Sequence, residues 1–134
     1  MVIQPLQFSG KSWQEKIDDL RQMLNESDKM AMVVSEPDEI AWLFNMRGEG
    51  TSTIDSLMIS PLFQSMALVT LDSVTLWVHT DKVDKSIREH LTLKYCNETN
   101  ACVVIRDFSN ATADLRNWAI DQNNVSRLIE KEIY

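Results

Sequence analysis

The chain has 134 residues, a length that fits one domain. Its net charge of −7 and its pI of about 4.7 argue against a nucleic-acid-binding protein, because an acidic surface repels the phosphate backbone. No apolar stretch approaches the ~20 residues that a membrane helix needs, so no membrane span is expected.

The N-terminal part predicts an extended lead-in followed by a helix. Residues 1–11 are expected to be extended. Ser12 and Glu15 then form a capping box, in which each side chain can satisfy a backbone N–H of the other residue. Apolar residues follow at helical spacing: Trp13, Ile17, Leu20 and Leu24. We expect this helix to end near residues 25–28.

The next part predicts a strand and a short helix. The apolar run 30–34 is typical of a buried strand. Pro37 and the acids after it are typical of a helix start, so we expect a helix over 38–45. Its core-facing residues are Ile40, Leu43 and Phe44. Residues 49–60 have no clear period and are expected to form a surface loop.

The central part predicts a hairpin, a helix and a further strand. Residues 66–71 and 74–79 are strands joined by a tight turn, and the second alternates apolar and polar residues as a sheet with unlike faces does. Apolar residues four apart predict a helix over 81–91. The run 101–105 predicts another buried strand.

The C-terminal part predicts a helix over 107–121 and a second helix over 125–134, with a C-terminal strand as the alternative to the latter. This order of helices and strands favours an α/β fold, a mixed β-sheet flanked by helices on both faces. No linker divides the chain, so residues 1–134 are expected to form a single domain.

Sequons and cysteines bear on the compartment. Four Asn-x-Ser/Thr sequons begin at Asn25, Asn97, Asn110 and Asn124, more than chance provides. Cys96 and Cys102 are close enough to close a small loop, and we expect a disulfide there in an oxidising compartment; two free thiols are the alternative. Both features favour a secreted or extracellular glycoprotein. Residues 1–9 lack a signal-peptide core, so a cytoplasmic protein stays the alternative.

Several segments resemble the three-domain aminopeptidase P (Xaa-Pro aminopeptidase) family. Residues 38–48 read D-E-I-A-W-L-F-N-M-R-G and are similar to that family's D-E-I-A-W-L-x-N-x-R-G. Residues 12–21 are similar to its S-W-x-x-K-x-x-D-L-R helix, and residues 60–63 to its N-P-V-F element. The resemblance extends from about residue 9 to about residue 120.

The resemblance implies a fold and a division of labour. This region is the second creatinase N-terminal-like domain of those enzymes, with a ribonuclease H-like fold. A separate pita-bread catalytic domain, expected to be absent here, binds two metal ions, usually manganese. That hydrolase domain removes the residue before a proline. The chain alone is therefore expected to be inactive, to hold no cofactor and to scaffold or gate the metallopeptidase.

The resemblance also implies partners, namely the catalytic domain or a peptide substrate. The alternative is a free-standing secreted, glycosylated interaction module that kept the fold without the activity. A homodimer is left open.

Trp42, Asn45 and Arg47 are the candidates for a contact with substrate or with a neighbouring domain. Trp42 is offset from the apolar stripe of its helix, and in the family this segment lies on the side that can approach active-site clefts. The structural interpretation is that Trp42 packs, Asn45 caps the helix end and Arg47 hydrogen-bonds the following loop.

His79 and His90 are the only histidines and are expected to be ordinary surface residues. A metal site needs further ligands at matching positions, and the sequence offers none. No catalytic residue is assigned.

Overall fold

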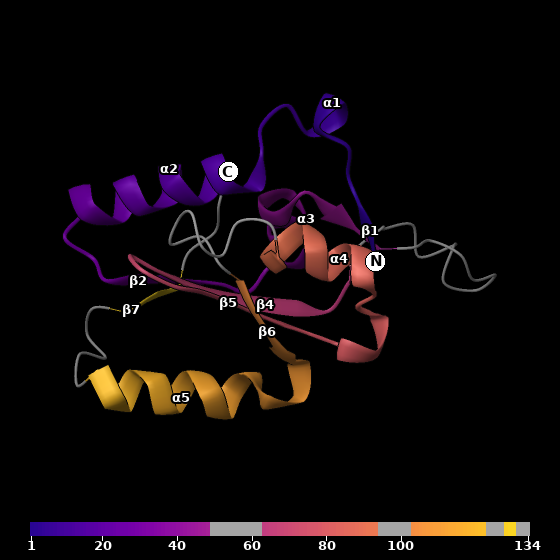
Figure 1. The fold of residues 1–134 in the computed structure, drawn as a ribbon. Helices are drawn as coiled ribbons and strands as arrows, with labels where there is room; N and C mark the ends of the chain where they lie inside the picture. Colours follow the sequence, from indigo (N-terminus) through magenta and orange to yellow (C-terminus); the bar gives the residue numbers. More distant parts are fainter. Residues whose placement is uncertain (49–62, 94–102, 123–127, 131–134) are drawn as a thin grey trace.

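The computed structural model describes residues 1–48, 63–93, 103–122 and 128–130. A five-stranded mixed sheet lies at the centre, with the strand order β6-β5-β4-β2-β7, and helices cover both of its faces (Figure 1). The expected α/β fold is thus confirmed. The strands are β2 (Ala31–Val34), β4 (Ser65–Thr70), β5 (Val74–Val78), β6 (Val103–Asp107) and β7 (Leu128–Glu130).

The three middle strands are antiparallel, and each outer strand is parallel to its neighbour. The β4–β5 turn lacks an Asn-Gly pair and is fastened by Thr70 instead. The Thr70 hydroxyl accepts from the backbone N–H of Ser73 at 2.9 Å, and the Thr70 N–H donates to the Ser73 carbonyl at 2.9 Å. Side-chain bonds of this kind replace the turn residues that short hairpins usually use.

Helices α2 (Trp13–Glu26), α3 (Pro37–Phe44) and α4 (Lys85–Arg88) cover one face of the sheet. The capping box at the start of α2 is confirmed: Ser12 Oγ accepts from the N–H of Glu15 at 3.2 Å, and Glu15 accepts from the N–H of Ser12 at 3.1 Å. The predicted apolar stripe of α2 is buried in the larger core.

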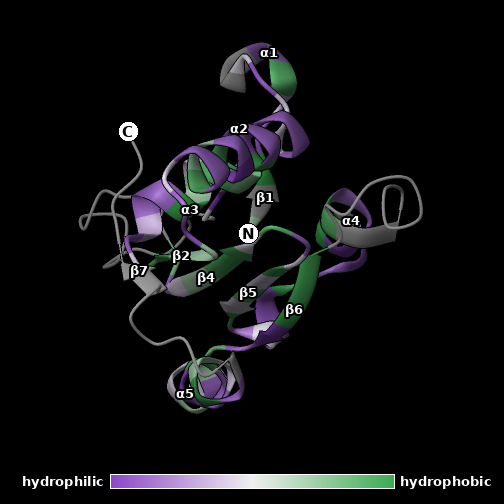
Figure 2. Cartoon of the chain, turned by 90° about the vertical axis from the view of Figure 1, so that its left-hand side faces the viewer, coloured by the Kyte–Doolittle hydropathy of each residue, from purple (hydrophilic) through white to green (hydrophobic). Residues whose placement is uncertain are grey.

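Helix α5 (Ala111–Gln122) covers the other face, after a short turn η4 (Phe108–Asn110). Because side chains alternate along a strand, β5 directs Leu76 to the larger core and Trp77 to α5. Figure 2 shows α2 and α3 on one side of the sheet and α5 on the other.

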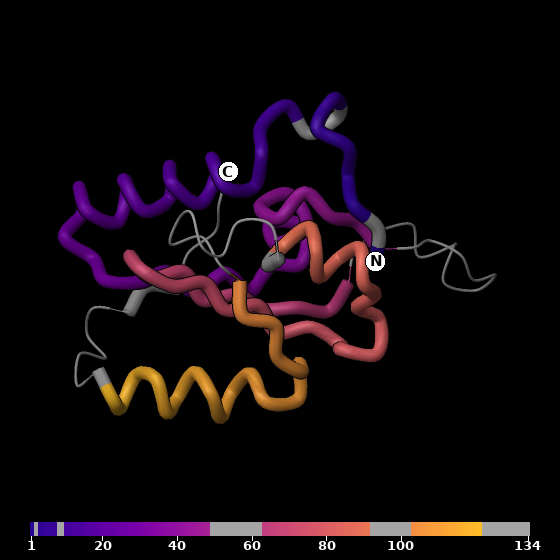
Figure 3. The backbone as a smooth tube through the Cα atoms, viewed as in Figure 1, coloured from indigo at the N-terminus to yellow at the C-terminus, as the bar shows by residue number. Residues whose placement is uncertain are grey.

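The N-terminal segment is not a simple extended lead-in. Strand β1 (Val2–Ile3) pairs antiparallel with β3 (Met46–Arg47) in a separate two-stranded ribbon. A single helical turn, α1 (Leu6–Ser9), follows, and Gly10 ends it in the left-handed conformation with φ 75°. Figure 3 traces this path from β1 through α1 to α2.

Two predicted helices need correction. The helix over 81–91 is instead a 3₁₀ turn, η2 (Thr80–Lys82), then α4, then a π-helical turn η3 (Glu89–Leu93). The break occurs because Asp84 caps α4, its carboxylate accepting from the N–H of Ile87 at 2.9 Å.

The prediction of a helix over 125–134 is wrong at residues 128–130. There β7 pairs in parallel with β2 and satisfies the backbone hydrogen-bonding groups along that side of β2. The alternative of a C-terminal strand is confirmed there. Residues 49–60, expected to form a loop, lie outside the described residues. None of the helices in the described ranges combines the length and apolar character that crossing a bilayer requires.

Candidate functional site

A buried lysine lies at the C-terminal end of α3. Lys16, on α2, is 3% exposed, and its ammonium donates to the Trp42 carbonyl at 2.6 Å and to Asn45 Oδ1 at 2.5 Å. Lys16 Nζ also lies 4.1 Å from the centre of the Trp42 ring. The last carbonyls of a helix carry partial negative charge, so this position favours a cation. Burial lowers the pKa of Lys16, and the charge of Lys11 adds to that effect.

Asn45 is the hub of this site. It follows α3 in the left-handed conformation, with φ 54° and ψ 51°, and is 4% exposed. Its carbonyl accepts from the N–H of Gln4 at 2.7 Å, and its Nδ2 donates to the Lys11 carbonyl at 2.8 Å. One residue thus holds both ends of the segment 4–11, which contains α1.

His90 fastens the same helix end from another side. His90 Nε2 donates to the Phe44 carbonyl at 2.8 Å, while the His90 carbonyl accepts from Trp13 Nε1 at 3.0 Å. Burial lowers the pKa of His90, although the bond to Phe44 opposes that change. The expectation of a surface histidine was wrong for His90, because the π turn carries its ring inward. His79 is half-buried, with a ring nitrogen 2.8 Å from Gln64 Oε1.

A hollow of about 460 Å³ opens beside Asn45. Eleven residues line it, and they come from the β1–α1 segment, the start of α2, Asn45 and the α4–η3 segment. Glu89 and His90 are the two ionisable side chains among the lining residues. The volume lies within the range of ligand pockets, but the lining includes no cluster of charged groups.

The three predicted contact residues lie in different surroundings. Trp42 and Asn45 meet at Lys16, and the Asn45 polar atoms are used inside the chain. Trp42 is 46% exposed, so it lies partly outside the core instead of packing within it. Arg47 is exposed, and its backbone pairs with Val2. Asn45 occupies the cap position through its backbone N–H, which bonds the carbonyls of Ala41 and Trp42. The contact role of these residues stays a prediction.

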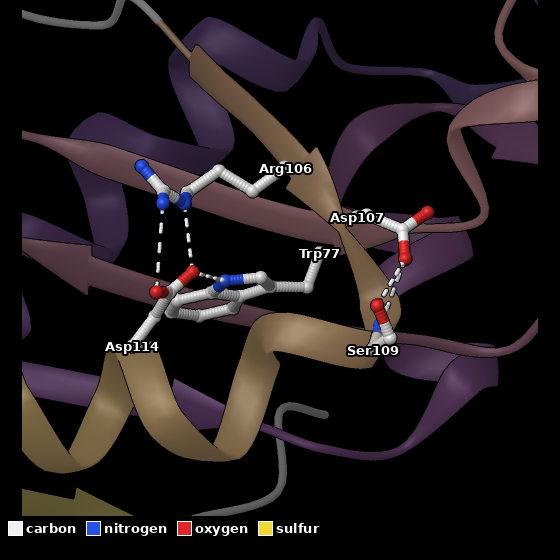
Figure 4. A network of polar contacts seen from close by, with 5 residues as sticks. All are labelled: Trp77, Arg106, Asp107, Ser109 and Asp114. Atoms are coloured by element: carbon white, nitrogen blue, oxygen red, sulfur yellow. Dashed lines mark hydrogen bonds and ion pairs between the residues drawn. The ribbon is translucent and has the colours of Figure 1, made fainter.

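A second polar network joins α5 to the sheet (Figure 4). Asp114 accepts from Trp77 Nε1 at 2.9 Å and from Arg106 Nε at 2.7 Å, and these contacts lower the pKa of Asp114. Asp107 accepts from the hydroxyl and the N–H of Ser109 and from Thr80, and these bonds lower its pKa to about 2. Each carboxylate is occupied by donors of the chain, so this network is structural.

The sequons and cysteines are only partly described. Asn25, in the last turn of α2, and Asn110, just before α5, are both exposed. Asn97, Asn124, Cys96 and Cys102 lie outside the described residues, so their predicted glycans and disulfide stay predictions. Within the described ranges, His, Cys, Asp and Glu side chains do not gather in groups of three or more that could hold a metal ion.

Sequence reasoning missed Lys16 and His90 as members of the site. The spacing of Lys16 did indicate a buried position, because it lies three residues after Trp13 and four before Leu20. It therefore belongs to the apolar stripe of α2. The contact of His90 could not be read from local spacing, because His90 meets Trp13 across 77 positions of sequence.

Comparisons with known proteins agree with this architecture. The family model "Creatinase/Prolidase N-terminal domain" matches residues 1–133. The chain is 43% identical over 91 residues to a probable Xaa-Pro aminopeptidase P of Leptosphaeria maculans, covering 68% of this chain and 14% of that protein. It is 38% identical over 114 residues to the Aspergillus niger protein of the same name, covering 85% of this chain and 16% of that protein.

A solved structure shares the fold. The X-prolyl aminopeptidase of Caenorhabditis elegans, described as a cytosolic enzyme with a di-nuclear active site, superposes with a TM-score of 0.75 at 20% identity, over 94% of this chain and 18% of that chain. The chain thus spans about a seventh of the length of the curated relatives above. The resemblance to aminopeptidase P is confirmed, and the chain belongs to the creatinase/prolidase N-terminal domain family.

Proposed function

We propose that this chain is a non-catalytic domain of an Xaa-Pro aminopeptidase-like metallopeptidase, where it scaffolds or gates a separate catalytic domain. The observation that carries the proposal is the site at the end of α3. Its lysine, asparagine and histidine bond to carbonyl groups of the chain itself, as parts of a rigid support do. The much greater length of the relatives supports a larger parent protein.

The contact with substrate or with the catalytic domain falls to Trp42 and Arg47. Both side chains are exposed enough to touch a partner, whereas Asn45 is buried. Lys16 beneath the Trp42 ring fixes the indole, so little side-chain entropy would be lost when a partner covers it.

Metal chemistry belongs to the catalytic domain in this proposal. The described residues of this chain offer no set of three acidic, histidine or cysteine ligands, so no step is assigned to a metal here. The di-nuclear active site of the worm enzyme supports a pair of metal ions in the parent protein, and manganese is our proposal for their identity.

A peptidase assay tests the inactivity of the isolated chain. The purified chain is incubated with an Xaa-Pro peptide and manganese, beside a full-length Xaa-Pro aminopeptidase as the positive control. We expect no release of the first residue. Peptidase activity that co-purifies with the chain would show that the non-catalytic assignment is wrong.

A chimera tests the scaffolding role. This chain replaces the matching segment of the Leptosphaeria maculans relative, and the kinetic constants are measured. Trp42→Ala is expected to raise KM roughly tenfold if Trp42 contacts substrate, and to lower kcat if it positions the catalytic domain. Leu71→Ala is the matched control, because Leu71 is also an exposed apolar residue, 41% exposed, at the β4–β5 turn. An unchanged KM and kcat for Trp42→Ala would contradict the contact role.

A second candidate is a secreted, glycosylated interaction module with the same fold. It is favoured by Asn25 and Asn110, because both sequon asparagines are exposed in the folded chain. When the chain is expressed in a secretory eukaryotic host, endoglycosidase treatment should lower its mass. This loss of mass should be smaller for the Asn25→Gln and Asn110→Gln variants. A chain of unmodified mass would argue against this candidate.

A further inference from the structure

The exposed residues Trp42 and Arg47, which we call the contact face, are both held by the N-terminal segment. Arg47 lies in β3, whose partner in the two-stranded ribbon is β1, with Val2 opposite Arg47. A ribbon of two such short strands is not stable alone. It is kept in place because Met46 is buried in the larger core and Ile3 packs against that core. The position of Arg47 therefore depends on β1.

A line of three hydrogen bonds joins the same segment to Trp42. The N–H of Gln4, directly after β1, donates to the Asn45 carbonyl at 2.7 Å. Asn45 Oδ1 accepts from Lys16 Nζ, which also donates to the Trp42 carbonyl and lies 4.1 Å from the centre of the Trp42 ring. Lys16 and Asn45 are both buried, so water does not compete for these bonds. A contiguous line of such contacts can carry a displacement from one end to the other.

Asn45 is the member of this line that can change its conformation. It is in the left-handed region, with φ 54°, which a residue with a Cβ keeps only where its surroundings enforce it. The bond from Gln4 and the bond to the Lys11 carbonyl are part of those surroundings. When β1 leaves β3, the Gln4 bond is lost and Asn45 is free to relax to an ordinary backbone conformation. Its side chain then turns away from Lys16, and Lys16 loses one of the two acceptors that hold it under the indole.

We propose that β1 controls the contact face: while β1 is paired with β3, Trp42 and Arg47 are held in place for a partner, and when β1 is displaced, both are released. The inference rests on the proposed function for the identity of the partner, because it names the regulation of the same site. By thermodynamic linkage the coupling is reciprocal, so a partner that covers Trp42 also strengthens the pairing of β1. The coupling itself lies within this chain and can be measured without a partner.

Fluorine NMR of the full chain, labelled with fluorinated tryptophan, tests the coupling. The chain has four tryptophans, and Trp42→Phe assigns the signal of Trp42. Gln4→Pro removes the N–H that bonds Asn45, and the extended backbone of β1 suits a residue that precedes proline. The Trp42 signal should shift by more than its linewidth and should respond more strongly to the exchange of light for heavy water. Gln4→Ala is the matched control, because it keeps the N–H, and it should leave the signal unchanged.

Lys16→Met should move the same signal, because it removes the ammonium from beneath the indole. The shifts caused by Gln4→Pro and Lys16→Met should not add in the double variant, since both changes act through the one bond between Asn45 and Lys16. Trp77 and Trp118 belong to the core on the opposite face of the sheet, so their unchanged signals show that a variant is folded.

An unmoved Trp42 signal in Gln4→Pro would overturn the proposal, as would an equal shift in Gln4→Ala or shifts that simply add in the double variant. If Gln4→Pro also moves Trp77 and Trp118, the wild-type chain decides: in rising urea, amide exchange at Gln4 and the change in the Trp42 signal should begin together, and a Gln4 amide that opens first without affecting Trp42 would refute the coupling. Failure of the proposed function is seen separately, as a chimera in which Trp42→Ala changes neither KM nor kcat.

Discussion

Replacing Lys16 by methionine is the sharpest test of how the α3 end is held. Methionine has a similar length and is flexible enough to fill the space, so the change removes the ammonium with little loss of packing. Two acceptors then lose their donor: the Trp42 carbonyl and Asn45 Oδ1, at 2.6 and 2.5 Å from Nζ in the wild type.

The expected loss follows from these contacts. An acceptor left unsatisfied in a buried site costs about 1–3 kcal/mol. The Trp42 carbonyl also accepts a long bond, 3.3 Å, from the N–H of Asn45, so its loss is partial. Removing a buried charge relieves a desolvation cost, which offsets part of the rest. We expect the free energy of unfolding to fall by about 2–3 kcal/mol, and the melting temperature by about 10 °C.

Urea unfolding followed by circular dichroism measures this loss. Lys29→Met is the matched control, because Lys29 is exposed just beyond the end of α2 and should change the unfolding free energy by less than about 0.5 kcal/mol. If Lys16→Met lowers the free energy of unfolding by less than about 1 kcal/mol, the Lys16 ammonium does not hold the end of α3 in place.

Three further predictions concern backbone strain and titration. Asn45→Ala should unfold more easily than Asn45→Gly by about 1 kcal/mol, because only glycine adopts the left-handed conformation without a steric cost; equal urea midpoints would contradict this. The pKa of His90 is lowered in the folded chain, so the unfolded chain binds more protons just below pH 6.5. The free energy of unfolding should therefore fall as the pH drops from 6.5 toward the lowered pKa. His90→Gln should flatten the dependence of stability on pH in this window. Asp107 should titrate near pH 2 when followed by NMR. Its contribution to stability is therefore complete above about pH 3.8 and is lost as the pH falls through about 2. Ser109→Ala should raise the pKa of Asp107 toward 3.8, and an unchanged pKa would show that Ser109 is not the cause of the shift.

Local patterns predicted much of the fold because they report which face of an element is buried. The stripe of α2, its capping box and the alternation of β5 each depend on residues within a few positions, and each is confirmed. The sequence of residues 38–48 likewise predicted helix α3 and its end at Asn45, because the helix and the asparagine that caps it are consecutive in the chain.

The errors have a common physical origin in contacts between distant parts of the chain. Residues 128–130 have an apolar pattern that suits either element, and the free edge of β2 decides for a strand. His90 looks like a surface residue until the π turn brings it to Phe44 and Trp13, 46 and 77 positions away. Lys16 was overlooked because a charge on an apolar stripe is usually solvated, and here the carbonyls that replace water come from another helix.

The double attachment of the segment 4–11 to Asn45 has a consequence for engineering. Its two ends are fastened to one residue, so the path between them is already closed, and lengthening a closed loop costs little further entropy. The tip of α1 is therefore a place where a foreign peptide, an affinity tag or a fluorophore could be grafted without disturbing the β-sheet beneath.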